Sequence, residues 1–466
     1  MHSQNLDDTI AAISTPLGQG GIGLVRISGK KALTIADGLF VGAGSSKPSS
    51  FKTHSVHYGK IVSRQDGKED VVDEALLVVM REPKSYTCED IVEIDCHGGI
   101  VAVRKILELV LQHGARLAEP GEFTKRAFLN GRIDLTQAEA VADIIQAKTE
   151  SFLKASVQQL KGDLVLELES IREVLMDVYV ELEAMVNFPE DGLEASQHSI
   201  LIEKVSQAKQ RIARLLESRY QGKILKEGIR IVICGKPNVG KSSLLNTLLR
   251  QPRAIVSPVE GTTRDTIEEF IQMNDFPVQL IDTAGILEPR DEIEKEAVRR
   301  SHLHIEQADL VLFMLDASGV LDDKDRNIAK GLQGKNVIAV LNKCDCRVRV
   351  NKDELQGSLS LKDTIEISAL YKKNIEELKE KIVQNVLHGH RIEPGDLIVS
   401  NTRQIESLDQ CLRAIERTEK YFSERLSFEF VSEEIKVAVN ALDQVTGRNI
   451  NQDLLDKIFA SFCIGK

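Results

Sequence analysis

Apolar residues between positions 164 and 185 recur at alternating spacings of four and three. The positions are Leu164, Leu168, Ile171, Leu175, Val178, Leu182 and Met185. This spacing places them along one face of a single long helix, as in the a and d positions of a heptad. Pro189 and Gly192 follow and predict that the helix ends there.

The same periodicity returns farther along the chain. One set predicts the next helix, and two more sets predict helices near the C-terminus. The sets are Leu201, Val205, Ala208, Ile212 and Leu215; Ile405, Leu408, Leu412 and Ile415; and Ile435, Val439 and Leu442. Between the two helical blocks, residues 229–386 alternate strand-like and helical runs, which is typical of an α/β domain.

The first 120 residues follow a third pattern. Short β-branched runs lie among turn residues, and one helical stretch is predicted over residues 101–113. The runs cover residues 9–13, 23–27, 75–80 and 91–94. This mixture predicts a small α+β domain.

Two helical blocks around an α/β block predict one helical bundle with another domain inserted into it, because domain termini usually lie close together. Three domains in a row are the alternative. The predicted limits are residues 1–120 for the N-terminal domain and 226–387 for the inserted domain. Residues 121–225 and 388–466 form the two parts of the helical domain.

Composition narrows the class of protein. With 42% hydrophobic and 28% charged residues, the chain has the composition of a soluble globular protein. A net charge of −11 means that any nucleic acid would be held by a local basic patch. The seven cysteines are scattered, no signal peptide is evident, and no apolar run reaches the roughly 18 residues of a membrane span. A cytoplasmic protein is therefore predicted.

A strand-like run at residues 229–234 leads into Gly-Lys-Pro-Asn-Val-Gly-Lys-Ser at residues 235–242, and helical spacing follows. This is the phosphate-loop pattern in the strand–loop–helix context that it requires. Backbone N–H groups and the helix N-terminus would cradle phosphates. Lys241 is predicted to reach the β- and γ-phosphates, and Ser242 to bind Mg2+. The GTP contacts predicted in this loop are Asn238, Val239, Gly240, Lys241, Ser242 and Ser243.

Two later motifs have the order of the switch regions. In Gly-Thr-Thr-Arg-Asp at residues 261–265, Thr263 is predicted to close on Mg2+ and the γ-phosphate. In Asp-Thr-Ala-Gly at residues 282–285, Asp282 is predicted to hold Mg2+ through water, and the N–H of Gly285 to meet the γ-phosphate. Further GTP contacts are predicted at Ser257, Thr262, Thr283 and Ala284.

Two more motifs select guanine. The carboxylate of Asp345, in Asn342-Lys343-x-Asp345, can accept two hydrogen bonds from guanine, which adenine does not offer. Ser368 and Ala369 are predicted to support the base from its other side. The chain is therefore predicted to be a GTPase. Its predicted fold class is multidomain, α+β and α/β, with an N-terminal α+β domain, a helical bundle and an inserted Ras-like P-loop GTPase domain.

Ile286 follows the Asp-x-x-Gly motif, where small Ras-like GTPases place a Gln that orients the attacking water. An apolar side chain cannot orient water, and no arginine finger is evident in the sequence. The chain is therefore expected to supply its water-orienting group and its compensating positive charge from elsewhere.

The phosphate-loop and switch motifs resemble the Era/EngA/TrmE group of GTPases, and the flanking sequences narrow the resemblance. These are Thr-Pro-Leu-Gly-Gln-Gly-Gly-Ile-Gly at 15–23, Pro-Gly-Glu-Phe-Thr-Lys-Arg-Ala-Phe-Leu-Asn-Gly at 120–131, Asp-Leu-Thr-Gln-Ala-Glu-Ala at 134–140 and Phe-Cys-Ile-Gly-Lys at 462–466. They are similar, from end to end of the chain, to the MnmE (TrmE) family of tRNA modification GTPases.

The resemblance implies a homodimer that works with a flavoprotein, MnmG (GidA), in a heterotetramer or larger assembly, with FAD only on that partner. Together they would add a carboxymethylaminomethyl- or aminomethyl-type group to C5 of the wobble uridine of certain tRNAs. The N-terminal domain is expected to make the dimer and to bind a tetrahydrofolate derivative, formyl-tetrahydrofolate. The G domains are expected to pair when K+ is present, and this pairing to drive GTP hydrolysis.

The resemblance also implies roles for single residues. Glu294 is expected to act with Lys241 in catalysis by orienting the attacking water. The expected K+ ligands are Asn238, Ser257, Val259 and Thr262, and the expected folate contacts are Arg26, Glu93, Arg132 and Lys466. The family often has Lys where this chain has Arg132, which keeps the charge but changes the donor geometry. Cys463 is expected to matter for modification.

Two alternatives stay open at this level. An Era- or EngA-type ribosome-assembly GTPase would carry an RNA-binding module such as a KH domain, whereas the block from Thr402 is helical and mixed in charge. A regulatory switch that acts only by binding partners is the other. His97 is predicted to be a turn residue, and its closeness to Glu93 leaves a site role as its alternative.

Overall fold

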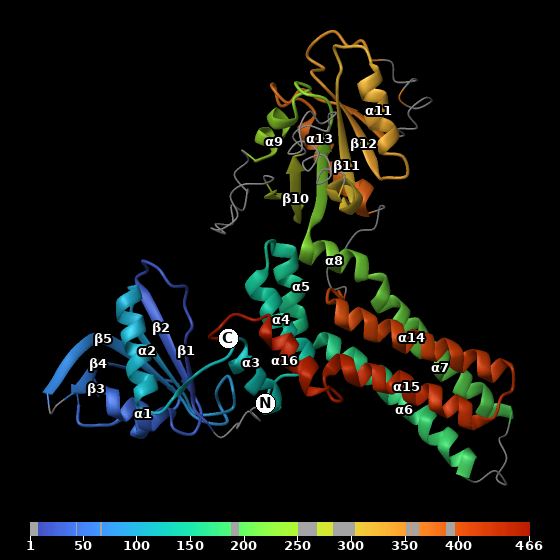
Figure 1. Ribbon diagram of the computed structural model, residues 1–466. Coiled ribbons are helices and arrows are strands. Elements are labelled where there is room, and N and C mark those ends of the chain that lie inside the picture. The colour runs from blue at the N-terminus through green and yellow to red at the C-terminus, as the bar shows by residue number, and fades with distance from the viewer. Residues whose placement is uncertain are drawn as a thin grey trace. The chain divides into compact units, whose positions relative to one another are not determined.

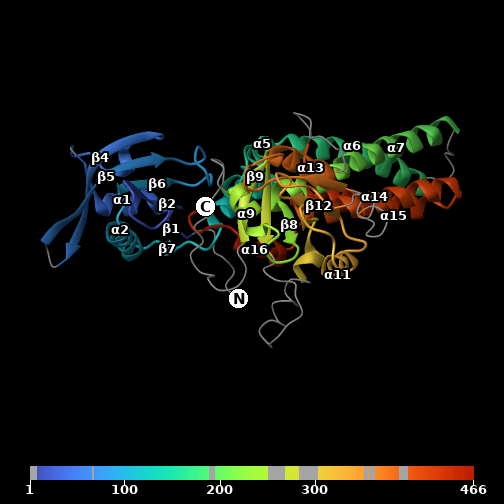
Figure 2. The same ribbon diagram turned by 90° about the horizontal axis from the view of Figure 1, so that it is seen from above.

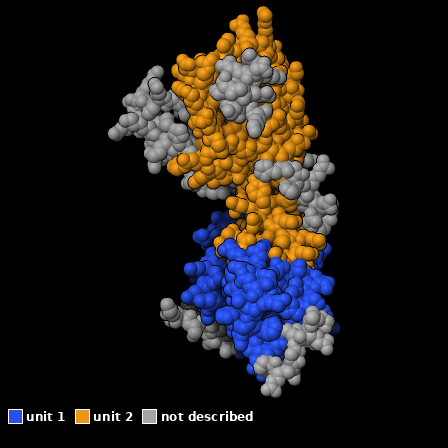
Figure 3. All heavy atoms as spheres, turned by 90° about the vertical axis from the view of Figure 1, so that its right-hand side faces the viewer, with its two compact units in different colours: residues 1–145, 159–208, 410–466 blue, residues 146–158, 209–409 orange. Residues whose placement is uncertain are grey.

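The structure is a computed structural model that describes residues 8–42, 44–65, 68–187, 195–249, 268–282, 303–350, 355, 363–387 and 397–466. The chain divides into two compact units, coloured separately in Figure 3. Unit 1 comprises residues 1–145, 159–208 and 410–466, and unit 2 comprises residues 146–158 and 209–409. The chain leaves unit 1 and returns to it. The domain limits given above are finer than this division and stay a prediction.

A seven-stranded sheet of order β3-β4-β5-β6-β2-β1-β7 opens unit 1. Its strands are β1 (Ile10–Ile13), β2 (Ile22–Ser28), β3 (Phe40–Gly42), β4 (Ser55–Gln65), β5 (Lys68–Met80), β6 (Ile91–His97) and β7 (Arg116–Leu117), with a 3-10 turn at Pro48–Ser50. Helices α1 (Ala32–Leu39) and α2 (Ile100–Gln112) pack on one face, over Val92, Ile94 and Cys96 of β6 (Figure 1). The α+β prediction is confirmed, although α1 was not expected.

The helices of unit 1 bury the predicted seam. They include α3 (Glu122–Leu129), α4 (Leu135–Gln146), α6 (Asp163–Asn187), α15 (Phe428–Thr446) and α16 (Gln452–Ala460). The first six seam positions of α6, from Leu164 to Leu182, are buried. Helices α6 and α15 lie side by side (Figures 1 and 2), and Arg172 Nε donates to Asp443 Oδ1 across them at 2.6 Å. The predicted helix end at Pro189 lies outside the described residues.

Helix α4 ends with Gln146 in unit 2, and three further described helices have several residues in each unit or end in the other one. They are α5 (Glu150–Leu160), α7 (Ala195–Glu217) and α14 (Thr402–Ser423). All five apolar positions that predicted a helix between Leu201 and Leu215 are buried in α7. The helical periodicity of the sequence therefore reports burial correctly in α6, α7 and α15, whereas in α14 only Leu408 and Ile415 of the four predicted positions are fully buried.

Unit 2 contains a six-stranded sheet of order β13-β12-β11-β8-β10-β9, parallel except for β9. The strands are β8 (Ile229–Cys234), β9 (Glu268–Met273), β10 (Phe276–Asp282), β11 (Leu310–Asp316), β12 (Val337–Asn342) and β13 (Asp363–Glu366). Helices α9 (Lys241–Leu249) and α13 (Ile375–Leu387) cover one face, and α11 (Asp323–Gly331) covers the other. The carboxyl ends of parallel strands share one edge, where ligands bind in open α/β sheets.

The connections into and out of this sheet run together within unit 2. Ser218, just before α8 (Arg219–Glu227), accepts a 3.1 Å hydrogen bond at its hydroxyl from Val399 N, and Arg219 pairs with Asp409 of α14 at 3.1 Å. Gly222 lies so close that a Cβ there would be 2.4 Å from Val399 O. Adjacent entry and exit are what an inserted domain requires. The predicted fold class is confirmed. Among the described helices, none has the length and apolar character needed to cross a membrane.

Candidate functional site

The loop between β8 and α9 has backbone conformations that favour glycine. Gly235 has φ of +145°, and a Cβ there would be 2.4 Å from Met314 O. Gly240 has φ of +101°, and a Cβ there would be 2.2 Å from Asn342 Nδ2. Asn238 adopts the left-handed region at φ of +65°. The glycines of the predicted phosphate loop are therefore required by the fold and by the close approach of neighbouring strands.

Lys241 is the first residue of α9 and bends back over the loop. Its Nζ donates to the carbonyls of Gly235 and Lys236, both at 2.9 Å. The exposed Ser242 and Ser243 follow it in the first turn of the helix. A helix N-terminus with a fixed ammonium group and hydroxyls beside it has the chemistry of an anion site. Lys241, Ser242 and Ser243 thus lie together at the start of α9, and their contacts with GTP and Mg2+ stay predictions.

Asn342, at the end of β12, joins the loops around this edge of the sheet. It is 3% exposed, its Nδ2 donates to Val239 O at 2.8 Å, and its Oδ1 accepts from Ala369 N at 3.0 Å. One buried amide therefore fixes the phosphate loop to the loop after β13. Lys343, at φ of +66°, pairs through Nζ with Asp316 Oδ2 at 2.6 Å. These contacts hold the loops after β12 and β13 in place.

The Asp345 carboxylate is exposed beside these loops. A hydrogen bond from the Ser368 side chain holds the pKa of Asp345 below its usual value, so that the group is an anion near neutral pH. Ser368 is itself buried and exchanges backbone hydrogen bonds with Lys373. An ionised, accessible acceptor is what two donors on a purine edge would need.

Several predicted residues lie outside the described part of the chain. They are Ser257, Val259, Thr262, Thr263, Thr283, Ala284, Gly285 and Glu294. Asp282 is described only as the last residue of β10, in register with Ile233 of β8. The roles given to these residues stay predictions.

A second polar cluster lies in unit 1, where β2 and β6 pair. Arg26 and Glu93 are directly opposite in this antiparallel ladder, with Arg26 Nε 2.7 Å from Glu93 Oε1. Arg26 Nη1 also donates to Gly465 O at 3.2 Å, and its guanidinium lies 5.6 Å from the centre of the Phe123 ring. The C-terminal residues thus contact a strand near the start of the chain.

The C-terminal segment is fixed by Gly465. Its φ is +90°, a Cβ there would be 2.5 Å from Ile13 O, and its carbonyl accepts from Ser14 Oγ at 3.0 Å. Cys463 accepts a 3.3 Å backbone hydrogen bond from Gly121 N at its carbonyl, while the residue itself is exposed. The Cys463 thiol is therefore accessible on a segment held by hydrogen bonds. Lys466 directly follows Gly465, whose carbonyl accepts from Arg26.

Arg132 joins the same cluster through Tyr86. Its Nη1 donates to Tyr86 O at 3.0 Å, and its guanidinium lies 4.9 Å from the centre of the Tyr86 ring. The Tyr86 hydroxyl shares a 2.9 Å hydrogen bond with Thr124, and burial raises its pKa despite the nearby charges of Arg132 and Arg26. Tyr86, Phe123 and Thr124 were not predicted as site residues, although Phe123 and Thr124 belong to the quoted sequence at 120–131.

His97 ends β6 and is exposed. Its Nδ1 lies 2.7 Å from Asp73 Oδ1, its backbone N donates to Asp73 Oδ2 at 2.9 Å, and the hydrogen bond that the imidazole donates to the Asp73 carboxylate raises the pKa of the imidazole. Its partner is thus Asp73 and not Glu93. Within the described residues, no group of three His, Cys, Asp or Glu side chains is placed to bind a metal ion.

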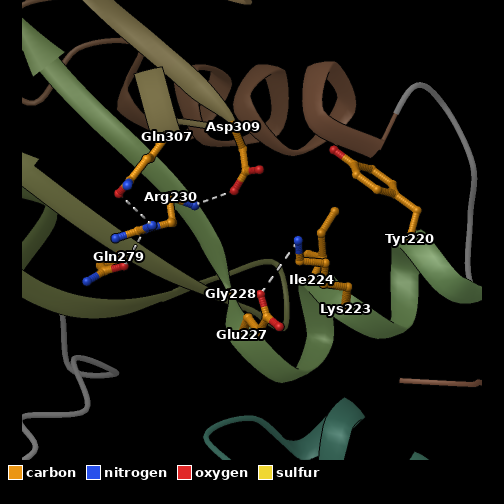
Figure 4. Close-up of a pocket in the computed structure, with 9 residues that line it drawn as sticks. All are labelled: Tyr220, Lys223, Ile224, Glu227, Gly228, Arg230, Gln279, Gln307 and Asp309. Carbon is orange, nitrogen blue, oxygen red and sulfur yellow. Dashed lines mark hydrogen bonds and ion pairs between the residues drawn. The ribbon is translucent and has the colours of Figure 1, made fainter. Parts of the chain in front are cut away.

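A pocket of 380 Å³ lies at the opposite end of the unit 2 sheet, where β8 begins (Figure 4). It is lined by α8 and by strand starts, with Arg230 Nε donating to Gln279 Oε1 at 3.2 Å and the Arg230 backbone N to Asp309 at 2.8 Å. None of the predicted site residues that the structure describes lines it. It is distinct from the edge that carries the phosphate loop.

Comparisons with known proteins cover nearly the whole chain. Residues 9–132 match the family GTP-binding protein TrmE N-terminus, and residues 135–463 match the family MnmE helical domain. The tRNA modification GTPase MnmE of Bacillus subtilis (strain 168) is 42% identical over 461 residues, which is 98% of this chain and 100% of that protein. That of Alkaliphilus oremlandii (strain OhILAs) is 43% identical over 461 residues, 99% of this chain and 100% of that protein.

Solved structures give a more limited likeness. Era of Aquifex aeolicus bound to GDP.AlF4- is 33% identical and covers 40% of this chain and 66% of that chain, with a TM-score of 0.29.

Proposed function

The chain belongs to the MnmE family of tRNA modification GTPases, and on this premise we propose that it hydrolyses GTP to drive modification of the wobble uridine of certain tRNAs. The reaction would add an aminomethyl- or carboxymethylaminomethyl-type group at C5, together with a flavoprotein that carries FAD, in the cytoplasm. The observation that supports it most is the loop from Gly235 to Ser242, whose glycines and Lys241 have the geometry of a phosphate site. The Era-type alternative is not supported, because the family matches include the regions on both sides of the GTPase domain.

In the proposed reaction, the N-terminus of α9 and Lys241 hold the β- and γ-phosphates. Ser242 and Thr263 would hold Mg2+, with Asp282 acting through water, and the ion would neutralise charge on the transferred phosphoryl group. The exposed hydroxyl group of Ser242 at the helix start fits this role. Asn238, Ser257, Val259 and Thr262 would hold K+.

Guanine selectivity is assigned to Asp345. We expect Asp345→Asn to weaken GTP binding by about ten- to a hundredfold, because the guanine donors would lose a charged acceptor. The variant is expected to favour xanthosine triphosphate, whose C2 oxygen accepts where guanine donates. Calorimetry with both nucleotides measures this, with Asp323→Asn, a highly exposed residue of α11, as the control. Unchanged GTP affinity in Asp345→Asn would remove the assignment.

The open face of the N-terminal sheet is the proposed homodimer contact. Paired residues of neighbouring strands form two rows on this face. One row crosses β4, β5, β6 and β2 and consists of Val56, Val78, Glu93 and Arg26; the next consists of Tyr58, Leu76 and Asp95. This face is the one not covered by α1 and α2. Val56 and Tyr58 are 59% and 58% exposed, and an exposed apolar surface of this kind is typical of an interaction site.

The Arg26 cluster is the proposed folate site. A folate has an anionic glutamate tail and a flat pterin ring. The cluster offers charged partners and one aromatic ring for these groups, namely Arg26, Arg132, Glu93, Lys466 and the ring of Tyr86. Arg26→Ala is expected to weaken formyl-tetrahydrofolate binding about ten- to a hundredfold, on the scale of a lost charged hydrogen bond. Calorimetry on the full chain tests it.

The matched control is Arg64→Ala, which removes an exposed arginine with a 3.0 Å ion pair to Glu69 on β5 of the same sheet. It should bind the folate like the wild type. If Arg26→Ala also binds like the wild type while retaining its thermal stability, the folate site lies elsewhere.

Cys463 is the proposed modification-linked residue. It lies in unit 1, whereas the phosphate loop lies in unit 2, so Cys463→Ser is expected to hydrolyse GTP at the wild-type rate. Wobble-uridine modification should be lost, because the thiol is exposed on an ordered segment beside the proposed folate site. Ser461→Ala in the same segment is the control. Reduced hydrolysis with normal modification in Cys463→Ser would contradict this role.

A further inference from the structure

Lys236 anchors the phosphate loop to α11 through two carboxylates. Lys236 Nζ lies 2.8 Å from Asp322 Oδ2 and 2.7 Å from Asp325 Oδ2, at the start of α11. The loop is thus connected through Lys236 to a helix on the other face of the sheet. Pro237 follows, and its fixed φ limits how far this part of the loop can adjust.

The two carboxylates form a fixed receptor for Lys236. Asp322 is the N-cap of α11, and Asp322 and Asp325 make reciprocal side-chain to backbone hydrogen bonds in a capping box. The Asp325 side chain is 3% exposed, and its Oδ1 has no hydrogen-bond partner among the described residues. A buried carboxylate in this position depends strongly on its cationic partner. The hydrogen bond from Lys236 also lowers the pKa of the Asp322 carboxyl to about 2.

The backbone of the same residue orients Lys241. The carbonyls of Gly235 and Lys236 accept from Lys241 Nζ at 2.9 Å each. An ammonium group has three N–H donors at tetrahedral angles, so two fixed acceptors determine the direction of its third. The position of the Lys236 peptide therefore sets the direction in which Lys241 presents its charge.

We propose that Lys236 is a positioning residue for GTP hydrolysis, anchored by Asp322 and Asp325 of α11 so that the carbonyls of Gly235 and Lys236 aim Lys241 at the phosphates. This inference rests on the GTPase activity of the chain. Small misplacements of a group that acts in the transition state are costly, about a hundredfold for 1 Å. The effect belongs in kcat more than in GTP affinity, because binding also uses the guanine loop and the helix N-terminus.

The test compares Lys236→Met, Lys236→Arg and Asp325→Asn in the full chain. Complete GTP saturation curves are measured for each variant, so that kcat is separated from KM. Lys236→Met is expected to lower kcat about tenfold or more with less than a threefold change in the dissociation constant of a fluorescent GTP analogue. Lys236→Arg should restore most of kcat, because it keeps the charge and can reach both carboxylates. The control is Arg326→Met, which removes an exposed ion pair within the same helix.

A double variant separates positioning from stability. If Asp325 acts through Lys236, Lys236→Met with Asp325→Asn should have a kcat no lower than Lys236→Met alone. Thermal unfolding of each variant shows whether lost turnover follows lost folding. The proposal is overturned if Lys236→Met keeps kcat within twofold of the wild type, or if Lys236→Arg is as slow as Lys236→Met. A wild-type chain that does not hydrolyse GTP would instead contradict the proposed function.

Discussion

Replacing Glu294 by Ala is expected to reduce GTP hydrolysis by about a thousandfold or more, the scale on which GTPases depend on completed transition-state contacts. The reason is that Ile286 stands where Ras-like GTPases place their water-orienting Gln. Glu294 takes that role in the proposed mechanism, by resemblance to the family. GTP affinity should stay nearly unchanged, because the residue acts only in the transition state.

The same mechanism predicts a specific requirement for K+. A cation held by Asn238 and the first switch would supply the positive charge that an arginine finger provides elsewhere, worth about 10³–10⁵ in rate. Turnover should therefore be stimulated in KCl and not in matched NaCl, and Asn238→Ala should lower the stimulation. Pairing of two G domains would order both switches, which light scattering with a transition-state analogue can follow.

Glu292→Ala is the matched control, since it removes an acidic residue two positions away. It should retain most of the turnover. Equal rates in the two salts, or a fully active Glu294→Ala, would mean that the chain hydrolyses GTP by another route.

Glu122→Gln is expected to destabilise the N-terminal part of unit 1 by about 1.5–3 kcal/mol, the scale of one lost hydrogen bond between charged groups. The Glu122 side chain is 4% exposed and pairs with both Arg116, at 2.7 Å, and Arg126, at 3.0 Å. Arg126 is 1% exposed and also pairs with Glu89 at 3.0 Å. Asp8 also pairs with both arginines, so the substitution would leave Arg116 with Asp8 alone, and the buried Arg126 would lose one of its three charged partners.

The network also predicts a pH dependence. Burial alone would raise the pKa of Glu122, but hydrogen bonds from Arg116, the Glu119 backbone and Arg126 outweigh it and hold the pKa below its usual value. A carboxyl with a lowered folded-state pKa stabilises the fold above its unfolded pKa, roughly 4.3 for Glu, and loses that stabilisation as pH falls through the folded value. Stability should therefore fall in acid, and Glu122→Gln should flatten this dependence.

Denaturant unfolding at pH 7 and in steps below pH 5 measures both effects. Glu69→Gln, which removes the acid of an exposed ion pair with Arg64, serves as the control and should change stability little. A Glu122→Gln chain as stable as the wild type at pH 7 would contradict this account of the network.

Local features of the sequence predicted much of the fold, including the loop between β8 and α9. The seam of α6 was visible because every third or fourth residue is buried, and the phosphate loop because strand, glycines and helix are contiguous. Helix α1 was missed because eight residues give too few turns for a periodic pattern. Strand β4 was not predicted, because charged residues interrupt its apolar ones. It lies beside β3, near one edge of the sheet.

Contacts between distant segments could not be predicted from these patterns. The carbonyl of Gly465 meets Ser14 and Arg26, more than 400 residues away in the chain, and no periodicity records such a pairing. The anchoring of Lys236 on α11 was hidden for the same reason, because its partners lie 86 and 89 residues farther on. Tyr86 entered the second cluster only through tertiary packing against Arg132.

The most direct test of the central claim is mass spectrometry of wobble uridines in tRNA from cells that lack this chain. The account predicts loss of the C5 aminomethyl-type group, its return when the wild-type chain is supplied, and no return with Lys241→Ala, in which the phosphate site is disabled. Wobble uridines that keep this group in the absence of the chain would contradict the claim.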